Sequence, residues 1–502
     1  MAPLPRRYAF SPLRMVGGLL GLLAFFAFLA VASPSRADDP AAPARVLHAV
    51  NRLTYGPAPG DLARVAGMGV PAFIAGQLDP DRLDEPPALA EALARLPTEA
   101  MDTVALFREY GPGAASGSPA GPEAMRRTFD RAGLAALEAA RARLTRAILS
   151  KRQLYELMVA FWSDFFSLGA KKGLAHLWVG SFEREAIRPH AMGRFLDLLA
   201  ATAMHPAMLI ARDNWKNVVH RDGGGPVKEA IDPTYAAILL AHQTLGPGGP
   251  QKPADTLALA RILTGWRVGA ARGASDTGGF YFDVGLHDPA DKVFLGHTIK
   301  GSGLAEGVEA LRVLAEHPAT AQTVCRRLVA YFLADEPPAP LVARLAGVFA
   351  KSGGDIRETL RALFDSPEFF DPKYLGARLK SPLRQAVSAV RALGAVPDDA
   401  TALAGALAGL GQPLYEADGP EGYPVTTAGW QKPDGLVRRV SFAGDLATGR
   451  IPGLGLAPGK TSEAALAATL GPGLSETTRQ AAARAAAAGP AVILGSPDFM
   501  RY

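Results

Sequence analysis

The chain has a single cysteine among its 502 residues, and this scarcity excludes two kinds of structure. One cysteine cannot form an intrachain disulfide, and it cannot build a thiolate metal cluster. On a helix, Cys325 shares one stripe with Ala321, Leu328 and Phe332. We therefore expect Cys325 to pack in the core as an inert thiol rather than to react.

Recognisable metal-binding and nucleotide-binding patterns are also missing. The nine histidines form no His-x-x-x-His or Glu-x-x-His pair on a helix. The sequence has no Gly-x-Ser-x-Gly elbow, no phosphate-binding glycine loop and no dinucleotide fingerprint. We therefore predict no tightly held metal ion and no cofactor.

Alternating runs of β-branched residues are nearly absent, whereas Ala, Leu, Arg and Glu recur with a period near that of a helix. With 48% hydrophobic and 20% charged residues, the chain is not disordered as a whole. The pattern predicts a mainly α, multi-helical globular protein with long irregular loops and at most minor β structure. The clearest helical segments are 122–151, 152–168, 181–203, 233–245, 254–264, 304–316, 319–334, 339–351 and 355–365.

The first 37 residues have the order of a secretory signal. Arg6, Arg7 and Arg14 precede an apolar run, Met15–Ala32, and a small-residue site then ends at Ala37. We predict export to the periplasm or the medium with cleavage after Ala37. An uncleaved membrane anchor is the alternative, because the apolar run is just long enough to span a bilayer. The pattern does not separate general secretion from twin-arginine export.

Removal of this segment changes the charge of the protein. Residues 1–37 contain four arginines and no acid, so the formal net charge falls from +5 to +1. A nucleic-acid partner then loses its main electrostatic attraction. We expect no nucleic-acid partner, and membrane contact only through the signal segment if it stays uncleaved.

The remainder, 38–502, is predicted to form one helical domain. Within it, 111–122 is rich in Gly, Ser, Ala and Pro and is predicted to be a flexible loop. The C-terminal part, 395–502, is richer in glycine, proline and alanine than the rest.

The stretch FWSDFF, 161–166, places four aromatic rings around Asp164. On a helix, Phe161, Phe165 and Leu168 belong to one apolar stripe, and Asp164 lies at its edge, about 60° from Phe161. Asp164 is either a partly buried carboxyl with a raised pKa, or an acid that caps a helix or pairs with an arginine. We favour the second interpretation, because the positions one turn away are apolar.

Two polar clusters carry the remaining candidate chemistry. In GLHDPADKVFLGHT, 285–298, the pair His287–Asp288 near Lys292 could orient a proton-transfer group. It could equally be an Asx-type turn before Pro289, which we favour. The second cluster, ARDNWKN, contains Asp213.

Eight segments resemble, in order, the family known as domain of unknown function 1800. They are LHAVNRLTYGPAPGDLARV (47–65), FWSDFF (161–166), IRPHAMGRFLDLLAATAMHPAMLIARDN (187–214), LARILTGW (259–266), GGFYFDVGLHDPADKVFLG (278–296), HPATA (317–321), SPEFF (366–370) and KSPLRQAVSAVRALGA (380–395). The resemblance implies an exported, mainly helical bacterial protein, often encoded beside a sulfatase-like DUF1501 protein. It implies no established reaction.

The chain departs from that family at two places. Where members commonly read FWHNHF, the two histidines are replaced here by Ser163 and Phe165. Where they commonly read YARELMELHTLG, this chain reads YAAILLAHQTLG, so two acids and a histidine are replaced by Ile238, Ala241 and Gln243. These changes indicate a divergent member in which a polar centre of the family has become packing surface.

Two functional hypotheses remain. The first is an exported binding or assembly protein of the bacterial envelope, with a co-exported DUF1501-like protein as its partner. The second is a hydrolase of envelope or exported polymers that uses the candidate residues His190, Asp213, His287 and Asp288. Convergence of these four side chains in a concave pocket would favour the hydrolase, and scattered positions would favour binding.

Overall fold

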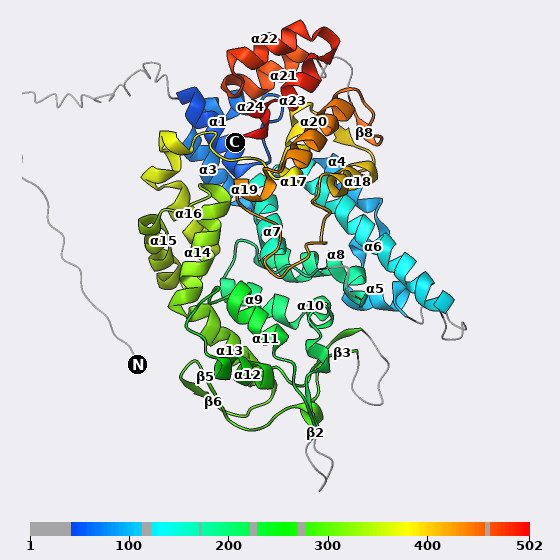
Figure 1. The fold of residues 1–502 in the computed structure, drawn as a ribbon, viewed down its shortest axis with the longest axis vertical. Helices are drawn as coiled ribbons and strands as arrows, with labels where there is room; N and C mark the ends of the chain where they lie inside the picture. Colours follow the sequence, from blue (N-terminus) through cyan, green and yellow to red (C-terminus); the bar gives the residue numbers. More distant parts are fainter. Residues whose placement is uncertain (1–41, 113–121, 170–172, 221–227, 270–277, 457–461) are drawn as a thin grey trace, which may run out of the picture. The chain divides into compact units, whose positions relative to one another are not determined.

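The computed structural model describes residues 42–112, 122–169, 173–220, 228–269, 278–456 and 462–502, which all belong to one compact unit. The predicted signal segment and most of the predicted loop 111–122 lie outside the described residues. The fold is mainly α with only small two-stranded sheets, which confirms the predicted class (Figure 1).

The N-terminal helices lead into two helices that form the middle of the unit. They are α1 (Ala42–Leu53), α2 (Asp61–Met68), α3 (Val70–Leu78), α4 (Pro87–Ala94), α5 (Thr103–Tyr110), the long α6 (Pro122–Leu149) and α7 (Gln153–Phe165). The apolar stripe predicted on α7 is buried, and Phe161, Trp162 and Phe165 pack edge to face or tilted against one another. FWSDFF is therefore core, as expected, apart from its acid.

The next elements are short and irregular. They are the 3₁₀ helix η3 (Gly173–Trp178), α8 (Val179–Ser181), the π-helical turn η4 (Phe182–Ile187), η5 (Arg188–His190), α9 (Phe195–Met204), α10 (Pro206–Ala211), η6 (Asn214–Lys216), α11 (Thr234–Ile238), the π-helical turn η7 (Leu239–Gln243) and α12 (Pro253–Ile262).

The prediction of one continuous helix over 181–203 is wrong. The chain widens into the π turn η4 and tightens at η5, where Pro189 lies. It then becomes extended at Arg194 before α9 begins. Proline lacks the N–H that an interior helical position donates, so the helix is interrupted there. The segment predicted as helix over 233–245 is also split, into α11 and η7.

Each sheet of the described residues is a single antiparallel pair. The pairs are β1 (Val218–His220) with β2 (Lys228–Ala230), β3 (Trp266–Gly269) with β4 (Gly279–Phe282), β5 (Lys292–Phe294) with β6 (His297–Ile299), and β7 (Val396–Pro397) with β8 (Leu454–Gly455). The turn between β5 and β6 consists of Leu295 and Gly296, both with positive φ, as a tight hairpin requires.

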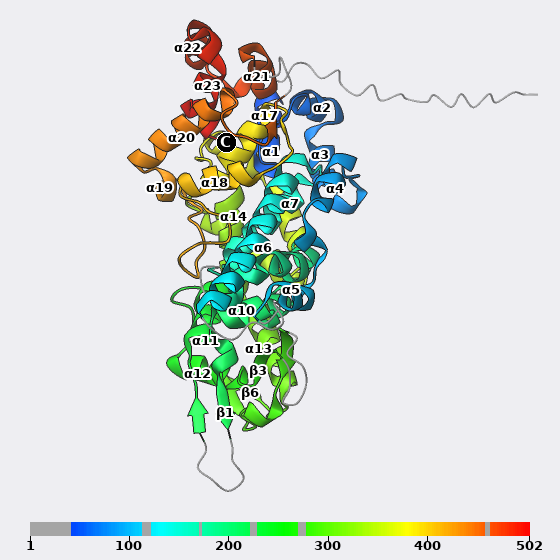
Figure 2. The same cartoon turned by 90° about the vertical axis from the view of Figure 1, so that its right-hand side faces the viewer.

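The C-terminal half returns to regular helices. They are α13 (Leu304–Glu316), α14 (Pro318–Phe332), α15 (Ala339–Lys351), α16 (Ile356–Phe364), α17 (Pro382–Ala392), α18 (Thr401–Gly409), α19 (Thr427–Trp430), α20 (Pro433–Ala447), α21 (Glu463–Leu470), α22 (Glu476–Arg484), α23 (Gly489–Leu494) and α24 (Pro497–Met500). Strands β1–β6 lie at the end of the unit away from α21–α23, as both ribbon views show (Figures 1 and 2).

Two helix starts follow from a His-Pro pair. The imidazoles of His205 and His317 each accept a hydrogen bond at 3.1 Å from the backbone N–H two residues later, and the following proline occupies the first helical position of α10 or α14. Both histidines therefore act as helix caps.

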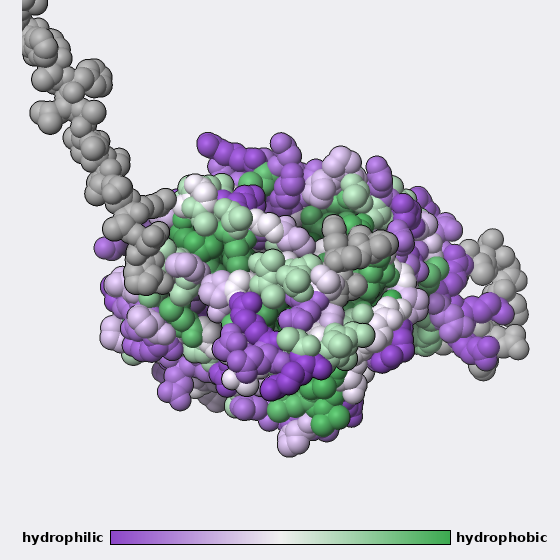
Figure 3. Space-filling model, turned by 90° about the horizontal axis from the view of Figure 1, so that it is seen from above, coloured by the Kyte–Doolittle hydropathy of each residue, from purple (hydrophilic) through white to green (hydrophobic). Residues whose placement is uncertain are grey.

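The apolar faces of these helices form one connected core. Cys325 lies inside it, which confirms the expected core position, and burial raises the pKa of its thiol to about 12. On the face shown in Figure 3, hydrophobic areas alternate with hydrophilic ones. Within the part of the chain that the structure describes, no helix has both the length and the apolar character needed to cross a bilayer.

Candidate functional site

Two of the four predicted site residues, His287 and Asp288, belong to one buried network. His287 follows the 3₁₀ helix η8 (Val284–Leu286), and its Nε2 contacts a carboxylate oxygen of Glu306 in the first turn of α13. The other oxygen of Glu306 accepts a hydrogen bond at 2.8 Å from Nζ of Lys292 on β5. Glu306 has no exposed surface, and His287 and Lys292 are 4% and 5% exposed.

Both ring nitrogens of His287 have polar partners inside the protein. Its Nδ1 lies 2.8 Å from the carbonyl oxygen of Thr264, which can only accept a hydrogen bond. Its Nε2 faces the carboxylate of Glu306. The ring is therefore held in place from both sides by buried groups.

Asp288 forms the predicted turn. Its carboxylate accepts a hydrogen bond at 3.1 Å from the N–H of Ala290, just after Pro289, and lies 3.0 Å from Nη1 of Arg261 on α12. Burial alone would raise the pKa of Asp288, but the hydrogen bonds from Ala290 and Arg261 and the charge of Lys292 outweigh it and lower the pKa. The Asx-type turn is confirmed.

Asp213 and His190 lie outside this network. Asp213 has a left-handed backbone conformation at the end of α10, and its carboxylate lies 3.1 Å from Nζ of Lys216, three residues on. His190 ends η5 and is half-buried. The structure therefore brings together His287 and Asp288 and does not add the other two candidates to them.

A second polar site, missed by the sequence reasoning, surrounds Asp164. This side chain lines two hollows of the unit. One is also lined by Arg143 on α6 and by Tyr415 and Tyr423 of the segment between α18 and α19. The other, which we call the arginine pocket, is lined on its far side by Arg378 and Arg384. The polar neighbours of Asp164 come from distant segments, so the apolar residues one turn away in its own helix gave no sign of them.

Burial and charge act in opposite directions on Asp164. Burial raises its pKa to about 6, and the charges of Arg143 and Arg327 limit the rise. The acid thus titrates near neutral pH, where a carboxyl group can hold or release a proton. The rejected interpretation of Asp164, as a partly buried carboxyl with a raised pKa, is the one that the structure bears out.

The two segments that depart from the family pattern meet at Arg327 on α14. Its guanidinium lies 4.6 Å from the centre of the Phe165 ring, and its charge acts on Asp164 and on His242 of η7. Gln243, at the position of the family's histidine, is buried, and its Nε2 has no hydrogen-bond partner among the described residues. In this chain an arginine therefore occupies the region between the two altered motifs.

An ion-pair network supports the wall behind Asp164. Arg188 binds Glu156 through two hydrogen bonds of 2.9 and 2.8 Å and contacts Glu183 at 2.8 Å, and the hydroxyl of Tyr415 donates to Glu183 at 2.7 Å. Burial alone would raise the pKa of Glu183, but Arg188, Arg143 and Arg146 hold it at about 2. The charged side chains of this wall are therefore paired with one another and held in place.

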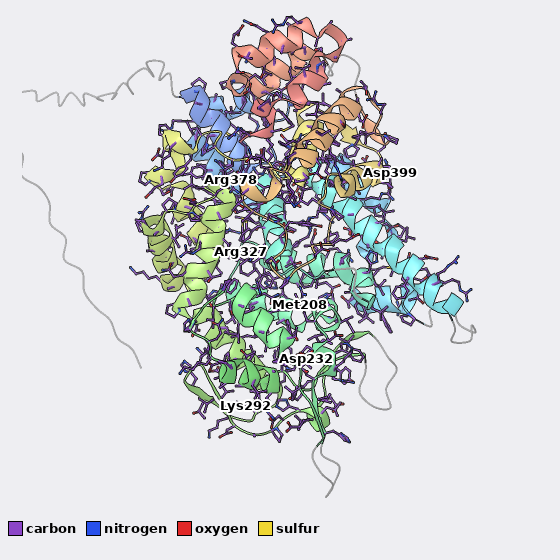
Figure 4. The ribbon with its side chains drawn as sticks, viewed as in Figure 1. Met208, Asp232, Lys292, Arg327, Arg378 and Asp399 are labelled. Atoms are coloured by element: carbon purple, nitrogen blue, oxygen red, sulfur yellow. The ribbon has the colours of Figure 1, made fainter. Side chains whose placement is uncertain are left out.

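The arginine pocket encloses a volume of about 40 Å³, and the larger volume of about 500 Å³ includes open solvent. Besides Asp164 and the two arginines, its wall contains Tyr331, Trp430 and Tyr502. It is a site separate from the His287 network, since Figure 4 shows Lys292 toward one end of the unit and Arg378 toward the other, with Arg327 between them. Within the described ranges, no three His, Cys, Asp or Glu side chains gather in a way that could hold a metal ion.

Comparison with known proteins gives one match. The model of the family described as "Protein of unknown function (DUF1800)" matches residues 48–501, nearly the whole chain. No curated protein and no solved structure matches the chain.

Proposed function

The chain belongs to the DUF1800 family, and on this basis we propose that it is an exported binding or assembly protein of the bacterial envelope. The partner that we propose is a co-exported DUF1501-like protein. Export rests on the order of charged, apolar and small residues in 1–37.

The observation that carries this proposal is the closure of the His287 network. A general base must reach a substrate proton within hydrogen-bond distance, directly or through one water. Both ring nitrogens of His287 are instead occupied by Thr264 and Glu306, and the side chain is almost fully buried. The network ties the segment after β4 to α12 and α13, which is a structural task.

The hydrolase alternative depended on convergence of all four candidate residues. Asp213 pairs with Lys216 and His190 lies on another turn, so neither supplies a second catalytic group to His287. Candidates that do not converge in one pocket support binding rather than hydrolysis.

Co-purification from the envelope tests the proposal. The affinity tag is inserted after Asp39, because Tyr502 at the other end of the sequence is buried in the arginine pocket. The tagged chain is co-expressed with the DUF1501-like protein of the same strain and purified from the periplasm. We expect both proteins to elute together in size-exclusion chromatography, and an unrelated exported protein with the same tag to elute alone.

Two results would contradict the binding role. One is elution of the tagged chain without its partner, combined with release of soluble fragments from purified envelope polymers. The other is a His287→Ala variant that keeps the wild-type melting temperature but does not complement a deletion strain. Either result would favour the hydrolase.

A further inference from the structure

We propose that the arginine pocket binds a small organic anion, whose carboxylate or phosphate group is held by Arg384 and Arg378. This inference deepens the proposed binding role and rests on it, because it names the chemistry of one ligand. It is carried by three buried guanidinium groups for which the described residues provide a single carboxylate, Asp335.

Arg384 is the clearest case. It lies in the first turn of α17, it is 5% exposed, and it lines the pocket. Its Nη1 donates to the carbonyl oxygen of Asn51 at 2.6 Å, whereas its Nη2 has no hydrogen-bond partner among the described residues. Arg384 forms no ion pair with any of the described residues. A buried donor without a partner is rare in native proteins, and a bound water or ion commonly supplies its acceptor.

Arg378 and Arg52 add to this positive charge. Arg378 is 3% exposed, donates to the carbonyl oxygens of Ala330 and Val425, and has one carboxylate near it, since its Nε lies 3.4 Å from Asp335. Arg52 is fully buried behind the pocket, and its Nε and Nη1 have no partner in the described part of the chain.

The three guanidinium groups surround a single ring. The guanidinium carbons of Arg384, Arg52 and Arg378 lie 4.2, 4.6 and 5.8 Å from the centre of the Tyr502 ring. Cation–π contacts stabilise each cation, but they do not neutralise it. Burial and the neighbouring cations lower the pKa of Arg52, although the phenol of Tyr502 acts against them, and the net pKa is about 9.

Charge balance therefore calls for an anion. Three buried arginines lie together. Among the described residues, the ion pair of this group joins Arg378 to Asp335. Buried charges in proteins are normally paired, because removing an unpaired charge from water is costly. Arginine stays protonated in proteins, so loss of its proton does not relieve this cost.

The other walls narrow the class of ligand. Guanidinium groups match the two oxygens of a carboxylate or phosphate. Tyr331 and Trp430 offer aromatic surface for an apolar part, and Asp164 on another wall disfavours a second negative group. A ligand with one anionic end and a hydroxyl or amine at the other matches the chemistry of these walls.

The test uses the full mature chain and three simple probes, namely inorganic phosphate, sulfate and acetate, at constant ionic strength against chloride. A ligand that binds only the folded state raises the melting temperature. We expect at least one probe to raise that of the wild type by about 2–4 °C at saturation. Arg384→Gln should lose this rise. The matched control Arg438→Gln, on α20 with a side chain 58% exposed, should keep it.

A second measurement covers the case in which Arg384→Gln does not fold. Calorimetric titration of the wild type is combined with tryptophan fluorescence, because Trp430 lines the pocket. We expect binding to change the fluorescence of the wild type, and Trp430→Phe to remove that change.

Three results would overturn the anion site: no rise with any of the three probes beyond that in chloride, an equal rise in Arg384→Gln, or an unchanged fluorescence response in Trp430→Phe. Failure of the partner to co-purify while the anion still binds would reject only the assembly role. Partner capture without anion binding would reject only this site.

Discussion

Nζ of Lys292 lies 2.8 Å from Oε2 of Glu306, a carboxylate with no exposed surface, and His287 contacts the other oxygen of the same group. One buried carboxylate thus holds the side chains of His287 and Lys292, which both come from the segment between β4 and α13. The His-Asp-Pro motif suggested proton transfer. In this structure it attaches that segment to α12 and α13.

Replacement of Glu306 should therefore be severe. Glu306→Ala leaves the ammonium group of Lys292 buried without its counter-charge and removes the partner of His287, so we expect the free energy of unfolding to fall by about 3–5 kcal/mol. Urea denaturation followed by circular dichroism measures this loss. Glu309→Ala, which removes a half-exposed acid paired with Arg312 on the same helix, should cost less than about 1 kcal/mol. Equal midpoints for the two variants would refute the structural role.

Asp288→Ala should destabilise the turn. The substitution removes the acceptor of the Ala290 N–H and the partner of Arg261, so we expect a loss of about 1–3 kcal/mol in the free energy of unfolding. Asp291→Ala is the control, because that side chain is half-exposed and pairs with the exposed Lys300. If both variants unfold at the wild-type urea concentration, the turn does not need its carboxylate.

Asp164 should make stability depend on pH in a defined direction. Its pKa in the folded state, about 6, lies above the ordinary value of 3.8, so the folded protein binds the proton more tightly than the unfolded chain. Its favourable contribution is present below pH 4 and is lost as the pH rises to about 6. Asp164→Asn stays neutral throughout, and we expect it to exceed the wild type by about 2–3 kcal/mol at pH 7.

Urea midpoints of the wild type and Asp164→Asn at pH 4.5, 5.5, 6.5 and 7.5 test this expectation, because the difference between them isolates the titration of one group. Asp434→Asn on α20, which removes a side chain 70% exposed, should follow the wild type at every pH. A difference that stays constant, or that favours the wild type as the pH rises, would show that Arg143 and Arg327 keep Asp164 ionised.

Export predicts a new N-terminus. If the segment 1–37 is a cleaved signal, mass spectrometry of the protein from the periplasm or medium should find a chain that begins at Asp38. Recovery from the membrane fraction of a chain that still contains Met15–Ala32 would instead indicate an anchored protein.

Features set by neighbours in the sequence were predictable. Helical periodicity predicted the fold class and His-Asp-Pro predicted the turn at Asp288, because each depends on residues within about one helical turn. The prediction of one continuous helix over 181–203 was wrong because local features interrupt the helix. Its apolar spacing was right, but the proline and the π turn interrupt it.

For the candidate sites too, some features follow from the sequence and others depend on the tertiary structure. The amino-acid sequence by itself determined that the chain is helical, that Cys325 lies in the core and that Asp288 forms a turn. Only the tertiary structure decided that Asp164 has Arg143 and Arg327 as neighbours and that Arg384, which reaches the carbonyl of Asn51, lines a pocket and keeps a buried nitrogen without a partner among the described residues. Burial and charge pairing depend on segments hundreds of residues apart, and local periodicity carries no information about which of them meet.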